Sequence, residues 1–245
     1  MIKPNSPLLR IPANIDRAQS IVLDGVRHAA EITDLAYSRL CASLVLVQER
    51  WEAGEPISAS EPLMYAWSMV DAIYRFMALR NARPLVRPPS LGGHSDHEND
   101  PLADIKRVRD VNDHPHNKLQ QVVASRGAAI GALNWLRFRE GPEPRPCSCA
   151  LVPGSTAIGT RIALHALPVD GSFASVDRIV LRAGGHVADL SAALRHLELE
   201  VAEIERHLEP QLTVNAGKSL IDICVVVEPG GGGPAEPSGE CRGTP

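Results

Sequence analysis

Arg109 and His114 are the residues of this chain whose types and spacing are best suited to chemistry. Arginine presents a planar, permanently charged fork that matches phosphate oxygens. Histidine gives and takes protons near neutral pH. Asp110 follows the arginine and shares a helix face with His114 at i and i+4, so its carboxylate can orient the imidazole. Together the three residues predict proton transfer and charge stabilisation at a phosphate.

Pro115 leaves the register of this motif open. Proline disfavours helical geometry in the residue before it and removes a backbone hydrogen bond, so we expect a kink at His114. The kink either rotates His114 toward Arg109 or favours His116, which shares the face of Arg109 in a straight helix. His116 is therefore an alternative proton carrier, and Asp113 is an auxiliary acid.

Two basic residues, Lys106 and Arg107, precede the motif and are candidate contacts for the phosphates of a nucleic acid. The formal net charge of −4 argues against broad electrostatic affinity for nucleic acid, so such contacts would be local. The alternative interpretation is a solvated helix face followed by a proline-induced turn. In that case Asp113 and His114 are ordinary capping residues.

Two long helices are predicted before the motif. The first runs from about Asp16 to Trp51, because apolar residues recur at steps of three or four. Those residues are Ile21, Gly25, Ala29, Ile32, Ala36, Leu40, Leu44 and Val47. The second begins at a capping box in residues 58–61 and runs to about Asn81. Its length suits an antiparallel partner of the first helix.

A third helix is predicted to carry the motif. Asp100 can cap it and Pro101 lies where a first-turn proline is tolerated. Helical spacing then continues through Leu102, Ile105 and Val108. Residues 83–100, which are rich in proline and polar residues, form the loop before it. Arg109 is therefore expected deep in the third helix.

Strands and a last helix are predicted beyond the motif. Residues 130–138, 159–167 and 176–181 have strand character, and residues 186–208 again show helical spacing. The predicted fold is mainly α, a four-helix up-and-down bundle with a small antiparallel β insertion between helices three and four. The insertion spans about residues 128–182.

Three segments are expected along the chain. Residues 1–15 form an N-terminal arm, 16–208 form one helical domain, and 209–245 form a C-terminal tail. The tail is expected to be disordered from about residue 229, because glycine, proline and charged residues cannot offset ordering entropy by burial. The apolar stretch 220–227 is a weak candidate for one more strand.

The long-helix pattern followed by Arg-polar-x3-His on the third helix resembles the HEPN superfamily of helical proteins, over roughly residues 16–208. The resemblance implies a metal-independent endoribonuclease without cofactor, acting as a homodimer in which two motif helices form one cleft. It implies active-site roles for Arg109, Asp110 and His114, with RNA as substrate. Such proteins include bacterial toxins and defence effectors, and they can have an antitoxin or nucleotidyltransferase partner. Pro115 departs from the usual pattern of this superfamily.

Other classes follow less directly from the sequence. A noncatalytic dimeric helical interaction module of the same architecture is the main alternative. A metal-dependent hydrolase would use His94, Asp96 and His97 with Cys147 or Cys149, but a short turn sequence is the simpler interpretation of both cysteines.

No apolar run approaches membrane-spanning length, and the five scattered cysteines indicate a reducing compartment, so we expect a cytoplasmic protein.

Overall fold

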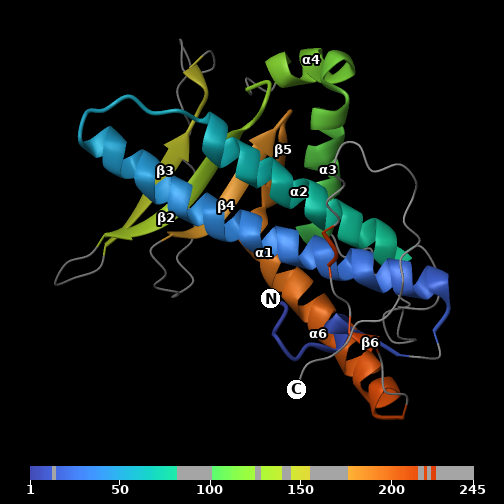
Figure 1. Ribbon diagram of the computed structural model, residues 1–245. Helices are drawn as coiled ribbons and strands as arrows, with labels where there is room; N and C mark the ends of the chain where they lie inside the picture. The colour runs from blue at the N-terminus through green and yellow to red at the C-terminus, as the bar shows by residue number, and fades with distance from the viewer. Residues whose placement is uncertain are drawn as a thin grey trace, which may run out of the picture.

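The computed structural model is mainly helical, with five helices and a four-stranded antiparallel sheet among the residues it describes (Figure 1). The described residues are 1–12, 15–81, 101–124, 128–139, 145–154, 176–214, 218–219 and 222–224. The helices are α1 (Arg17–Glu52), α2 (Ser60–Asn81), α3 (Pro101–Asp113), α4 (Pro115–Ala124) and α6 (Leu190–Val214). The sheet lies between α4 and α6 in the chain, with strand order β3-β2-β4-β5.

Local capping fixes both ends of α1. The backbone N–H of Gln19 donates to the Asp16 carboxylate, and that of Asp16 donates to the Gln19 side chain, both at 2.8 Å. This reciprocal pair is a capping box. At the other end Gly54 adopts a φ of +73°, a conformation in which glycine commonly terminates helices. The first predicted helix is confirmed.

α1 has apolar residues on two faces, which the sequence pattern did not separate. Leu40 and Leu44 lie in the core. Ile21 and Ile32, which the same spacing grouped with them, are 60% and 46% exposed. Steps of three and four residues recur on every face of a long helix, so one list of apolar positions can merge two stripes. The apolar positions of α1 therefore divide into a buried set that includes Leu40 and Leu44 and an exposed set that includes Ile21 and Ile32.

α2 runs antiparallel to α1 and lies beside it for most of its length (Figure 1). It begins at Ser60, whose backbone N–H donates to the Ser58 hydroxyl at 3.2 Å. Its inner face contributes large, fully buried side chains to the core, including Met69, Ile73 and Phe76. The predicted second helix, ending at Asn81, is confirmed.

The predicted third helix is confirmed over α3, but the chain breaks at His114 and starts a separate helix, α4. Pro115 is the first residue of α4, where its missing N–H costs nothing. The His114 carbonyl accepts the backbone N–H of Lys118 at 3.0 Å and so begins the new helix. The expected four helices therefore become five, and the β insertion follows the fourth helix instead of the third.

Of the four strands of the sheet, two were predicted, whereas β3 and β5 were not. β2 (Ala132–Arg139) and β4 (Val176–Ala183) confirm the strands expected at 130–138 and 176–181. The strand expected at 159–167 lies outside the described residues. β3 (Arg145–Leu151) contains Cys147 and Cys149, which were wrongly interpreted as turn sequence. Its pairing with β2 in continuous register, from Arg139 with Arg145 onward, overrides its weak local signal.

β5 (His186–Asp189) corrects the start of the last predicted helix. Gly184 and Gly185 have φ values of +54° and +84°, and this turn folds β5 back onto β4. α6 then begins at Leu190, where the Asp189 carboxylate accepts the backbone N–H of Ala192 at 2.8 Å. The helical spacing before residue 190 was fortuitous, because four residues are too few to distinguish the helical period of 3.6 residues from the strand period of two.

A short strand before α1 pairs with a short strand after α6. β1 (Arg10–Ile11) pairs antiparallel with β6 (Lys218–Ser219), so the expected arm and tail meet in one small sheet. The short 3-10 helix η1 (Pro7–Leu9) places Leu8 in the core. The tail expected to be disordered from residue 229 lies outside the described residues. None of the described helices is both long and apolar enough to cross a membrane.

Candidate functional site

Arg109 joins α3 to α2 instead of pointing freely into solvent. Its Nε donates a hydrogen bond to Asp71 Oδ1 at 2.9 Å, and its Nη1 lies 2.7 Å from Asp113 Oδ2. Its guanidinium carbon lies 4.0 Å from the centre of the Tyr74 ring, a cation–π contact. Asp71 and Tyr74 are one turn apart on α2, and Asp113 ends α3. The group therefore functions as a clamp between two helices.

The electrostatics of this clamp do not favour an anion. Burial lowers the pKa of Arg109, but the hydrogen bond to Asp71 and the negative charge of Asp113 outweigh it and raise the pKa above its ordinary value. The guanidinium is thus charged at all relevant pH values. Two carboxylates face one cation, so the immediate cluster carries a net negative charge, which repels phosphate.

Asp110 does not orient His114 in this structure. Its Oδ2 lies 3.2 Å from Lys118 Nζ, an ion pair that bridges the break between α3 and α4. Among the described residues no hydrogen bond joins Asp110 to His114. The i to i+4 relation holds only within one helix, and α3 ends at Asp113. The predicted catalytic group is therefore divided between two helices.

His114 and His116 are both exposed at the start of α4. Within the described part of the chain, neither imidazole has a side-chain hydrogen bond or an ion pair. Each ring is thus accessible to solvent and to any binding partner, but none of the described residues fixes its tautomer or orientation. Preorganised catalysis requires such a support.

The two basic residues before the motif differ in their environment. Arg107 Nη1 lies 2.7 Å from Asp104 Oδ1, one turn earlier on α3. Lys106 is exposed and has no ion pair among the described residues. Among the described residues, Arg107, Arg109 and Lys118 are paired with carboxylates, and Lys106 is the one cation of α3 and α4 without an ion pair. The carboxylates are those of Asp71, Asp104, Asp110 and Asp113. A positively charged path for RNA is not formed by these side chains alone.

Sequence reasoning missed the partners that fix the motif helices, because they lie far along the chain. Asp71 is separated from Arg109 by 38 residues. Gln121 of α4 donates to the carbonyl of Gly184 at 2.7 Å and lies 3.1 Å from His186 Nε2. α4 is thus anchored to the β4–β5 turn. Asp71 shares its face of α2 with the polar residues Ser68 and Arg75, so the local sequence contained no signal of its pairing with Arg109.

The proposed metal ligands are only partly described. His94, Asp96 and His97 lie outside the described residues, and within those residues no group of three or more His, Cys, Asp or Glu side chains is placed to hold a metal. Cys147 and Cys149 share one face of β3. Burial, followed by the neighbouring Cys147 thiol, raises the pKa of Cys149 to about 12. At neutral pH Cys149 is a protonated, weakly nucleophilic thiol.

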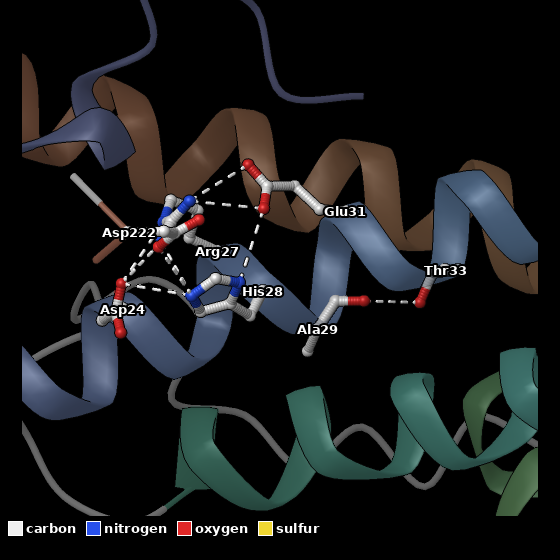
Figure 2. Close-up of polar contacts among 7 residues, drawn as sticks. All are labelled: Asp24, Arg27, His28, Ala29, Glu31, Thr33 and Asp222. Carbon is white, nitrogen blue, oxygen red and sulfur yellow. Dashed lines mark hydrogen bonds and ion pairs between the residues drawn. The ribbon is translucent and has the colours of Figure 1, made fainter. Parts of the chain in front are cut away.

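A second polar cluster, which the sequence analysis missed, surrounds Arg27 on α1. Figure 2 shows its guanidinium facing Asp24, Glu31 and Asp222, at 2.9, 3.3 and 2.8 Å, with His28 alongside. Arg27 is only 4% exposed. The Asp222 carboxyl has a lowered pKa, mainly through its hydrogen bond from Arg27. Three carboxylates around one guanidinium leave an excess of negative charge at this end of α1.

Replacing Arg109 with alanine is expected to lower the free energy of unfolding by about 1–2 kcal/mol, because two partly screened ion pairs and a cation–π contact are lost. The matched control is Arg107→Ala on the same helix. It removes one exposed i,i+3 pair and should cost only about 0.3 kcal/mol. Urea denaturation measures both values. If Arg109→Ala lowers the free energy of unfolding as little as Arg107→Ala does, then Arg109 contributes nothing to the contact between α2 and α3.

Comparisons of the chain with protein-family models, with curated proteins and with solved structures find no match. The likeness to the HEPN superfamily therefore remains a resemblance carried by the motif and the helical pattern. Function has to be inferred from the charges, contacts and surfaces of this chain.

Proposed function

We propose that this chain is a noncatalytic helical interaction module that associates with another protein through the outer face of α1. One observation carries the proposal: the face of α1 opposite the core displays large apolar side chains to solvent. These are Ile21, Ile32, Leu35 and Leu46, exposed by 60%, 46%, 59% and 42%. Isolated exposed apolar residues are ordinary, whereas aligned ones are typical of an interaction surface.

The arrangement of the motif supports the same proposal. Arg109 serves the joint between α2 and α3, and Asp110 serves the joint between α3 and α4. Both roles explain why these residues are charged without requiring a substrate. In this interpretation the motif maintains the shape of the helical unit, and α1 binds the partner.

A second candidate is metal-independent RNA cleavage, which the exposure of His114 favours. Arg109 also retains an Nη2 group without a partner among the described residues, on a side chain that is 27% exposed. In this mechanism the ribose 2′-hydroxyl attacks the adjacent phosphate, His114 transfers the proton, and Arg109 stabilises the charge of the transition state. RNA would be the substrate, and a homodimer and an antitoxin or nucleotidyltransferase partner remain part of this proposal.

An RNA cleavage assay in EDTA separates the two candidates. We expect the wild type and Arg109→Ala/His114→Ala to leave cellular RNA equally intact, because no preorganised proton donor is held at the motif. Arg206→Ala/His207→Ala is the matched control, since it removes the same residue types from α6. Circular dichroism confirms that each variant is folded.

Fragments with 2′,3′-cyclic phosphate ends, formed by the wild type and the α6 control but not by the motif variant, would establish the ribonuclease instead. Loss of proton transfer alone would then slow cleavage by about 100-fold or more. Such a result would overturn the noncatalytic assignment and leave the surface of α1 to be explained separately.

A further inference from the structure

The outer face of α1 carries a regular line of residues, here called the α1 seam. It consists of Ile21, His28, Ile32, Leu35, Arg39, Ala42 and Leu46. Successive steps of seven, four and three residues keep these positions within an arc of about 80° on a helix of 100° per residue. His28 is partly exposed and the other members are exposed. This is the spacing by which two helices pack side by side.

The α1 seam is complementary to itself when a second copy lies antiparallel. If Ile32 packs against the second copy's Leu35, the two antiparallel helices are in register about a point between residues 33 and 34. Ile21 then lies opposite the second copy's Leu46, because positions 21 and 46 are equally far from that point. The same contacts recur with the roles of the copies exchanged, so a two-fold axis passes through that point. Four apolar contacts then extend over about 38 Å of helix, at a rise of 1.5 Å per residue.

The charges of the seam agree with the same register. This antiparallel register places Arg39 opposite the second copy's His28, which lies beside Asp24 and Glu31 of that copy. Those two acids belong to the cluster of Figure 2, in which carboxylates outnumber the guanidinium of Arg27. Arg39 is exposed and has no ion pair among the described residues. An unpaired cation in each copy thus meets an excess of negative charge in the other.

We propose that a second copy of this chain occupies the α1 seam, forming an antiparallel homodimer in which Ile32 meets Leu35 and Arg39 meets the acidic cluster around Arg27. The inference rests on the proposed function, for which it names the partner. The motif residues of α3 and α4 take no part in this interface.

Sedimentation velocity of the full chain over a range of concentrations tests the surface. Leu35→Glu should raise the dissociation constant of the dimer by about 30-fold or more, since a central apolar contact is replaced by a charge in both copies. Leu199→Glu is the matched control, because Leu199 is a leucine of α6 that is 71% exposed. The control should leave the dissociation constant unchanged. Both side chains are outside the core, so both variants are expected to fold.

Disulfide trapping tests the register. In the antiparallel arrangement Ile21→Cys protein mixed with Leu46→Cys protein should form a disulfide-linked heterodimer on mild oxidation, whereas Ile21→Cys protein alone should not. The two Ile21 positions lie at opposite ends of the paired helices, about 38 Å apart. The wild type, which contains the five native cysteines, is the background control.

Each contrary outcome has a defined meaning. A dimer that is equally insensitive to Leu35→Glu and Leu199→Glu overturns the α1 seam as the interface but leaves self-association, and hence an interaction module, in place. Rapid disulfide formation by Ile21→Cys alone overturns the antiparallel register. A wild type that stays monomeric at high concentration overturns the homodimer. If a different protein then binds and Leu35→Glu abolishes its binding, the proposed function survives while the inference fails.

Discussion

Phe76→Ala is expected to lower the free energy of unfolding by about 3–5 kcal/mol, among the largest losses that a single substitution in this chain should cause. Phe76 is fully buried on the inner face of α2, within the same apolar cluster as Leu40 of α1. Truncation removes the transfer free energy of the ring and leaves a cavity that helices on several sides cannot fill. Urea denaturation monitored by circular dichroism measures the change.

Trp51→Ala provides the control for Phe76→Ala. Trp51 also carries a large aromatic ring, but it is 69% exposed near the end of α1. Its replacement should change stability by no more than about 0.5 kcal/mol. Similar losses at both positions would mean that the core is not centred between α1 and α2. A large loss at Phe76 alone would confirm that the core lies where the inner face of α2 packs against α1.

Long amphipathic patterns made the helices predictable. α1, α2 and α3 follow from apolar spacing sustained over many residues, together with start signals such as the capping sequence in residues 58–61 and the proline at position 101. Short elements were not predictable in the same way. β3 contains a proline and two cysteines and is held by its pairing with β2, so its local sequence carries little strand signal.

The candidate site was only partly accessible to sequence reasoning. Residue types and spacing correctly placed Arg109 on α3 and anticipated an interruption at His114, because both depend on neighbouring residues. The partners could not be inferred. Asp71 reaches Arg109 through the packing of α2 on α3, and Lys118 reaches Asp110 only because the chain turns at Pro115. Such charges determine whether an arginine is free to bind phosphate or already engaged in a structural ion pair.

Gly184→Ala is expected to destabilise the fold by about 2–4 kcal/mol, which combines left-handed backbone strain with overpacking. Gly184 has a φ of +54° in the β4–β5 turn, and an added Cβ would lie 2.7 Å from Val111 Cγ1. Val111 is a β-branched residue of α3, only 1% exposed, and has little freedom to move aside. The substitution should therefore push α3 away from the sheet and loosen the Arg109 clamp.

Gly54→Ala separates the two contributions. Gly54 also has a positive φ, +73°, but nothing lies within 4 Å of an added Cβ. Gly54→Ala should therefore introduce backbone strain alone and lower the free energy of unfolding by about 1–2 kcal/mol. The excess at Gly184 then measures the close packing of the turn against α3. Amide hydrogen exchange should show this excess as faster exchange in α3 and α4, which the turn contacts through Val111 and Gln121. Equal losses at the two glycines would mean that Val111 yields to the added methyl group, and that the position of α3 is set by its contacts with α2 instead.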